Sequence, residues 1–436
     1  MADIESAHLD MTSLTSEAIG DAMGRRARGG VVQRSVSQTV GLTAGRALAA
    51  VVSFAWMAVI ARSLGTDDVG ALSLGLSLAV ALSVIPDLGL PMIVTNRVAQ
   101  HPEDTRSLVR HVISIRLRVS LAAGVMLVVM YRLGTTENLA VPLFMTLSIA
   151  ATTVHSTATA ALRGLATVVP DSVNEIVSRL FVLSLGWWLL ESGHGIAAAA
   201  GTLAAADVLS AVALMRVLWR RSARGTAFPP GLIAWRTVVP LAAALLVGTL
   251  HARIDVWLLA LIGSAGDVAH YAVPARIAEG LLLPAGVASA LVLPLTAGVA
   301  DARARGRLAL RYVGVVTAVV ALAGVVAAVW AGPLLEYAFG NPYGRDRDVL
   351  RLLCAAAVPT AVCIGLAPIV AILARRALVR WVLVAFIVNV AVNLALLPGY
   401  RGIGAAWASL ASMSVVAAGL ALTVVRLQPA DPGATP

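Results

Sequence analysis

Lysine is missing from this sequence, and all 33 basic residues are arginines. A nucleotide-binding P-loop requires a lysine that reaches the phosphates, and Schiff-base catalysis requires a lysine amine. The chain therefore contains neither a P-loop motor nor a lysine-based covalent enzyme. We attribute the exclusive use of arginine to a compositional bias of the genome.

Cysteine, aromatic residues and charge are also scarce. The two cysteines, Cys354 and Cys363, lie in apolar surroundings, and their number and spacing fit neither a disulfide framework nor a metal site. We expect both to be packing residues. Charged residues make up 13% of the chain, against about 25% in soluble domains. The sequence predicts no catalytic residue, no metal and no cofactor.

What the chain does contain is apolar sequence, because 59% of its residues are hydrophobic and its mean hydropathy is +0.87. Apolar segments of about 20 residues recur, each long enough to cross about 30 Å of hydrocarbon. They are continuous runs rather than the alternating strands of a membrane barrel. We predict an all-α integral membrane protein with about twelve transmembrane helices. The predicted spans are 39–61, 70–91, 112–133, 139–161, 172–191, 195–218, 237–262, 268–297, 308–331, 349–373, 378–397 and 402–426.

The arginines predict the orientation in a cell (plasma or inner) membrane. Arginine clusters alternate between successive loops, and cytoplasmic loops are the ones that accumulate positive charge. The alternation fits an even number of helices with both termini in the cytoplasm. We expect residues 1–36 to form a disordered cytoplasmic tail rather than a signal peptide, because the first apolar run begins near Val40.

A weak internal repeat divides the chain into two halves. "LGTDDVGALSLG" (64–75) follows the first span and "IGSAGDVAHYAVP" (262–274) follows the seventh, so that Asp68-Val69 matches Asp267-Val268. Repeated half-bundles with a site at their interface are a common transporter plan. We therefore predict two six-helix lobes around a central cavity. The predicted boundaries are an N-terminal lobe at 37–219, a cytoplasmic linker at 220–236, a C-terminal lobe at 237–427 and a tail at 428–436.

Five stretches resemble the oligosaccharide flippases of polysaccharide biosynthesis, which share a superfamily with multidrug and toxin exporters and peptidoglycan lipid flippases. The five stretches are "VIARSLGTDDVGALSLGLSL" (59–78), "IPDLGLP" (85–91), "RIDVWLLALIGSAGDVAHYAVPARI" (253–277), "LLEYAFGNPYGRDRDVLRLL" (334–353) and "VNVAVNLALLPGYRGIGAAWASLAS" (388–412). They occur in both halves, in the order and at the spacing of the family.

The resemblance implies an alternating-access flippase, not an enzyme, that moves a polyprenyl-phosphate-type oligosaccharide from the inner to the outer leaflet for cell-surface polysaccharide assembly. Its partners would be this substrate and the bilayer, with a proton, sodium or the membrane potential as driving force and no nucleic acid. A multidrug and toxin exporter is the alternative. A membrane polysaccharide polymerase or ligase fits less well, because the longest predicted outer loop lacks histidine. The saccharide, the coupling ion and the oligomeric state are left open.

Charged residues inside predicted spans mark the candidate site, because such residues usually face a bundle interior or a watery cavity. Arg253 and Asp255 lie two residues apart deep in the seventh span and, on a continuous helix, point to different faces. We predict that Arg253 faces the cavity and binds an anionic headgroup; the structural alternative is that it ties its helix to the adjacent one. Asp255 either ties its helix to a neighbour or senses a cation.

Four further residues complete the candidate set. Arg276 and Glu279 are three residues apart and can pair on one helix face, and Arg276 is also a candidate partner of Asp255. Arg46, two turns into the first span, and Arg276 are candidate headgroup ligands, and the alternative for Arg46 is that its side chain extends to the inner interface. Asp207, an isolated carboxylate near the middle of the sixth span, and Glu279 are candidate coupling or structural groups. A hydrogen bond to serine or threonine is the structural alternative for Asp207.

Other charges have structural interpretations. Glu175 and Arg179 are four residues apart in the favourable order and predict an ion pair. Arg116 and Arg118 lie near the inner end of the third span, where long side chains can extend to phospholipid headgroups. His155 lies among hydroxyl-bearing residues, and we expect it to be hydrogen-bonded rather than a proton relay.

Overall fold

The computed structural model describes residues 48–87, 89–135, 138–167, 169–222, 246–289 and 302–427. Every regular element in these ranges is a helix, and each predicted apolar span contains helix. Seven of the described helices are long and apolar enough to cross a membrane. The prediction of an all-α membrane fold is therefore confirmed.

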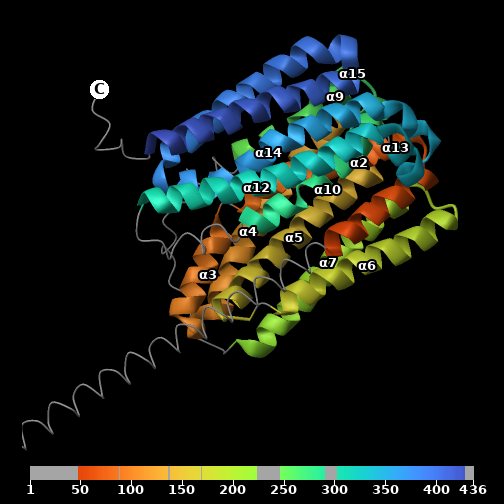
Figure 1. Cartoon of the computed structure of the whole chain (residues 1–436). Helices are drawn as coiled ribbons and strands as arrows, with labels where there is room; N and C mark the ends of the chain where they lie inside the picture. The colour runs from red at the N-terminus through yellow and green to blue at the C-terminus, as the bar shows by residue number, and fades with distance from the viewer. Residues whose placement is uncertain are drawn as a thin grey trace, which may run out of the picture.

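The first lobe is a bundle in which α5 and α7 pack together, α4 covers α5, and α6 covers α7. Its helices are Leu48–Ser63, α2 (Thr66–Asp87), α3 (Leu90–Gln100), α4 (Thr105–Gly134), α5 (Ala140–Gly164), α6 (Val169–Glu191) and α7 (Ile196–Arg221). They occupy the red to yellow-green part of Figure 1.

The second lobe, green to blue in Figure 1, is built around α14, which packs against α12 and α15. Its helices are residues 246–251, α9 (Ile254–Ile262), α10 (Ala265–Leu281), residues 283–289, α12 (Ala302–Val329), α13 (Ala331–Phe339), α14 (Arg347–Leu373) and α15 (Arg375–Leu427). Arg401 has a non-helical backbone (φ 47°, ψ −126°), so α15 contains two helices joined at a kink.

The predicted lobe boundaries fall mostly on residues that the structure does not describe. The tails 1–36 and 428–436 lie outside the described residues, and so does the predicted linker except for its first three positions, 220–222. The helix α7 ends at Arg221, and helix resumes in the described part of the chain at residue 246. The linker therefore stays a prediction.

The two lobes meet where α2 and α10 begin. A methyl group built on Gly70 would lie 1.7 Å from the carbonyl oxygen of Ala265, and one built on Gly266 would lie 2.9 Å from a carboxylate oxygen of Asp67. Because the sequence repeat matches Asp68 to Asp267, positions 67 and 266 are equivalent in the two halves. The lobes thus touch at equivalent positions, as expected beside an axis that relates the repeats.

Two further contacts join the lobes at this end, which the arginine pattern predicts to be the outer end. The Arg62 guanidinium donates to the carbonyl oxygen of Tyr337 in α13. Phe54 packs edge-on against Phe339, with ring centroids 5.2 Å apart. Together with the α2–α10 contact, they close the space between the lobes at the predicted outer face.

A buried charge ties α2, α4 and α5 together inside the first lobe. Arg116 is fully buried, its Nη2 donates to the Asp87 carboxylate and to Ser156 Oγ at 2.9 Å, and its Nε donates to the Pro86 carbonyl at 2.9 Å. The prediction that Arg116 extends to lipid headgroups is therefore wrong. Asp87 and the hydroxyls of α5 supply acceptors within reach, so the guanidinium need not leave the bundle.

We predict that Gly70→Val opens the outer contact. Overpacking of a close contact costs about 1–3 kcal/mol, so the closed arrangement loses about tenfold in population. A cysteine placed at Leu76 in a chain without native cysteines should react faster with an impermeant maleimide added outside the cell. The matched control is Gly65→Val, because a methyl group there has no neighbour within 4 Å. Equal labelling of the two variants contradicts the closed contact.

We also predict that Arg116→Ala destabilises the first lobe. Arg118→Ala should not, because Arg118 lies two residues further along α4 on its exposed face. Removing one member of a buried ion pair costs about 3–5 kcal/mol, and we expect the lower end because the Asp87 side chain is 42% exposed. Thermal unfolding of the purified variants in detergent measures the difference. Equal midpoints for the two variants would show that the Arg116 contacts contribute little.

Candidate functional site

A cavity of about 700 Å³ lies between the lobes. The first lobe lines it with the helix Leu48–Ser63, α2, α6 and α7, and the second lobe with Arg253, α10 and the residues that follow α10. Its α2 residues, Leu76 and Val80, and its α10 residues, beginning at Arg276, all come after the outer contact of these helices. The cavity therefore lies on the predicted cytoplasmic side of that contact.

Three charged side chains form a linked group on the second-lobe wall. Arg253 Nη1 lies 2.9 Å from Glu279 Oε1, and Arg276 Nη1 lies 2.8 Å from Glu279 Oε2. Both arginine side chains are about a quarter exposed, at 26% and 27%. One carboxylate thus serves two guanidinium groups, and each guanidinium keeps donors directed to the cavity.

Arg253 lies at a break in the seventh span. Residues 246–251 are helical, residues 252–253 form a turn, and α9 begins at Ile254. The Arg253 backbone (φ −135°, ψ −6°) is not helical. The prediction of one continuous helix over 237–262 is therefore wrong at this point.

Asp255 is held inside the second lobe. Its carboxylate is buried, accepts from the Tyr271 hydroxyl and from Ser409 Oγ at 3.2 Å, and accepts from the Val256 backbone N–H at 2.9 Å. It lines a smaller cavity of about 160 Å³ that adjoins the larger one and shares the linked group of two arginines and one glutamate with it, but Asp255 itself does not line the larger cavity. The pairing of Asp255 with Arg276 is therefore wrong, because Tyr271 and Ser409 already satisfy the carboxylate.

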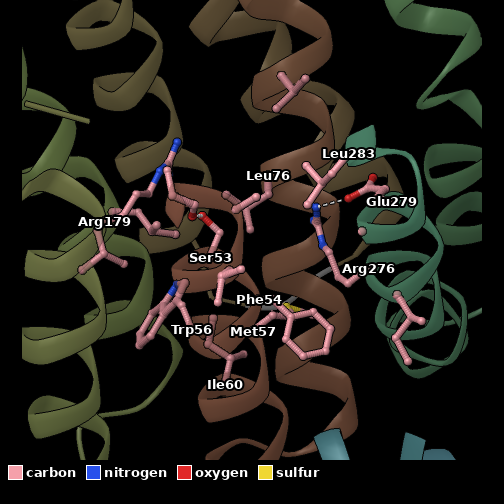
Figure 2. A pocket seen from close by; sticks show the side chains of 18 of the residues that line it. Ser53, Phe54, Trp56, Met57, Ile60, Leu76, Arg179, Arg276, Glu279 and Leu283 are labelled. Atoms are coloured by element: carbon pink, nitrogen blue, oxygen red, sulfur yellow. Dashed lines mark hydrogen bonds and ion pairs between the residues drawn. The ribbon is translucent and has the colours of Figure 1, made fainter. Parts of the chain in front are cut away.

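The first-lobe wall carries Glu175 and Arg179 of α6. Figure 2 shows Arg179 on one side of the cavity and the paired Arg276 and Glu279 on the other. Among the described residues Arg179 forms no ion pair, so the predicted Glu175–Arg179 pair is wrong. Sequence spacing placed both residues on one helix face, and that face borders the cavity.

The remaining candidates lie elsewhere. Asp207 accepts from the Ser148 hydroxyl of α5, which is the structural alternative given for it. His155 lies 2.9 Å from Ser210 Oγ and 3.5 Å from the Asp171 carboxylate, so it is hydrogen-bonded as expected. Arg46 lies outside the described residues. The coupling roles of Asp207 and Asp255 stay predictions.

The chemistry of the cavity is that of an anion site. Among the described lining residues three are arginines and two are glutamates, which gives an excess of one positive charge. The group of described residues with metal-ligand geometry, His101, Glu103 and Asp104, does not line the cavity. Arginine forks bind carboxylate and phosphate groups in bidentate fashion. The arrangement can therefore hold a phosphate or an acidic sugar between the lobes.

Arg179 is the lining charge that the sequence analysis did not propose for binding. Its i, i+4 relation to Glu175 explained it as a structural pair. The signal that favours a site is its position, two turns inside an apolar span, where an unpaired arginine is costly. The structure shows that Arg179 lines the cavity and forms no ion pair with another described residue.

Comparison with solved structures shows the fold. The lipid II flippase MurJ in an inward closed conformation superposes with a TM-score of 0.71 at 11% identity, covering 88% of this chain and 87% of that chain. An inward-facing multidrug resistance MATE family transporter of the MOP superfamily gives 0.67 at 15% identity, covering 87% and 95%. A MOP superfamily transporter from Pyrococcus furiosus, described by the reverse polarity of its binding pocket, gives 0.56 at 13% identity, covering 90% and 95%.

Comparison of the sequence shows the family. A search of curated proteins finds no significant match. The family model described as polysaccharide biosynthesis protein matches residues 35–295, which is more than half of the chain. The chain therefore belongs to the polysaccharide biosynthesis protein family, as a multi-pass membrane protein with the two-lobed transporter fold of the MOP superfamily.

Proposed function

We propose that this chain is a flippase that moves a lipid-linked saccharide with an anionic phosphate headgroup from the inner to the outer leaflet. The observation that carries the proposal is the group Arg253–Glu279–Arg276 facing Arg179 across the cavity between the lobes. A polyprenyl phosphate or pyrophosphate needs cationic donors once it leaves the interface, and arginine supplies them in bidentate form.

The shared carboxylate makes the site able to exchange partners. Without substrate, Glu279 neutralises part of the charge of Arg253 and Arg276. A phosphate that enters can take over donors from either guanidinium without breaking both ion pairs. The positive charge of the two arginines is thereby balanced by Glu279 or by the phosphate at every stage, in a space where an unpaired arginine is costly.

The apolar part of the cavity lining suits a lipid. Val51, Val80 and Leu283 are large hydrophobic residues on this lining and are 60%, 46% and 37% exposed. They lie on the helix Leu48–Ser63, on α2 and on the segment after α10. The polyprenyl chain can remain against these side chains and the bilayer while the headgroup occupies the cavity.

Alternating access follows from the contacts between the lobes. The outer contact at Gly70 and Ala265 is tight, and the cavity lies on its cytoplasmic side. The headgroup would enter from the inner leaflet in this arrangement. Release toward the outer leaflet would require the outer contact to separate, as the two lobes rock about the bound substrate.

A multidrug exporter is the second candidate, because transporters of that class share this fold. A cationic drug needs carboxylates, and here the described lining has more arginine than glutamate. The two candidates differ in what Glu279 does. For an anionic headgroup it competes with the substrate, whereas for a cation it would be the ligand.

We predict that Arg253→Ala stops export of the surface polymer while the protein still reaches the membrane. Loss of a charge-assisted hydrogen bond costs about 1.5–3 kcal/mol, which lowers headgroup affinity about tenfold to a hundredfold. Arg253→Lys keeps the charge without the fork and should be intermediate. The control is Arg375→Ala, at the exposed start of α15. Normal export in Arg253→Ala rules out its binding role.

We predict opposite effects of Glu279→Gln on the two ligand classes. In binding titrations of the purified protein, a short-chain polyprenyl pyrophosphate should bind as tightly as to the unmodified chain or more tightly, because Arg253 and Arg276 lose their competitor. A cationic dye should gain nothing. Loss of dye binding together with weaker pyrophosphate binding would favour the drug exporter and overturn the flippase proposal.

A further inference from the structure

A further cavity lies on the surface of the first lobe, away from the space between the lobes. It has a volume of about 630 Å³, lies between α4, α5 and α7, and shares no lining residue with the central cavity. Ala150 and Ala151 of α5 and Ala211 of α7 contribute small side chains to it. Because these residues are small, the neighbouring helices leave a groove rather than a filled surface.

The groove is apolar along most of its length. Leu117 on α4, Leu147 on α5 and Val212 on α7 line it and are 37%, 47% and 60% exposed. Its α7 lining runs from Val208 to Arg220, a distance of about 18 Å at 1.5 Å per residue. That length is close to one leaflet of a hydrocarbon core about 30 Å thick. The groove therefore fits the chains of a lipid in one leaflet.

One end of the groove is cationic. Arg216 and Arg220 line it four residues apart, so their side chains are neighbours on α7, and both are exposed. No carboxylate in the described ranges forms an ion pair with either. Like charges at this spacing repel each other. A bound anion would remove this repulsion, and arginine pairs are suited to phosphate.

A tryptophan is fixed at the same end. Trp219 lines the groove, its carbonyl oxygen accepts from the Arg106 guanidinium, and the Arg106 Cζ lies 5.8 Å from the centre of its ring. Tryptophan and arginine collect at the level of lipid headgroups. The arginine pattern of the loops predicts that this end of α7 faces the cytoplasm. The cationic end therefore lies where inner-leaflet phosphates lie.

We propose that this groove is a binding site for an anionic phospholipid of the inner leaflet. Its acyl chains lie along Leu117, Ala150 and Val212, and its phosphate lies between Arg216 and Arg220. The site does not depend on the function of the central cavity, because the two share no residue. The observation that carries the proposal is the coincidence of a groove one leaflet long with an arginine couple at its headgroup end.

The test compares two double variants of the purified full chain. Arg216→Gln with Arg220→Gln removes the arginines of the groove. Arg375→Gln with Arg376→Gln removes two exposed arginines from the predicted cytoplasmic end of the second lobe. Delipidated protein is titrated with phosphatidylglycerol, phosphatidylcholine or a short-chain polyprenyl phosphate, and bound lipid is counted by native mass spectrometry. Both variants have the same net charge.

We expect phosphatidylglycerol to bind about tenfold more weakly to the groove variant, as for a lost charge-assisted contact, and unchanged to the control variant. Ala150→Phe, which fills the groove and keeps its arginines, should also weaken binding and separates the groove from general electrostatic attraction. Equal losses in the two double variants, or phosphatidylcholine binding as well as phosphatidylglycerol, overturn the proposal. So does selective loss of a polyprenyl phosphate with phosphatidylglycerol retained, because the groove would then hold substrate.

Discussion

A charge within the hydrocarbon core is costly unless another polar group meets it, and this constraint organises both lobes. Arg116 is satisfied by Asp87 and by hydroxyls of α5, and Asp255 by Tyr271 and Ser409. These contacts close within a single lobe, so each lobe is a self-contained body. The central cavity differs, because its described arginines outnumber its described carboxylates. A net positive charge thus lines the space between the two lobes.

The tight packing of the outer contact serves the same arrangement. Gly70 and Gly266 allow the starts of α2 and α10 to touch, which closes the cavity at the predicted outer face. Further along, the same two helices diverge and carry lining residues of the cavity. Arg253, at the break before α9, lies on the wall of that space, whereas the Asp255 carboxylate is hydrogen-bonded inside the second lobe. The helices α2 and α10 therefore supply both the contact that closes the outer face and part of the cavity lining.

Much of the fold was predictable from the sequence, whereas the partners of the charges were not. Each predicted apolar span contains helix where the structure describes it, and helical spacing correctly paired Arg276 with Glu279. The same spacing wrongly paired Glu175 with Arg179, and the position of Arg116 near a helix end wrongly predicted that it reaches lipid headgroups. Spacing along one helix shows which side chains are neighbours on its surface. It carries no information on the acceptors that an adjacent helix presents.

The sequence by itself determined the membrane-embedded helical class, because continuous apolar runs of sufficient length have no other satisfied backbone in lipid. It also determined that every arginine-type or lysine-type charge would be an arginine, and its weak internal repeat predicted two related halves. Only the tertiary structure decided that Arg253, Arg276 and Arg179 face one cavity while Asp255 and Asp207 do not. The physical reason is that helix breaks and packing between helices, rather than residue order, set the direction of each side chain.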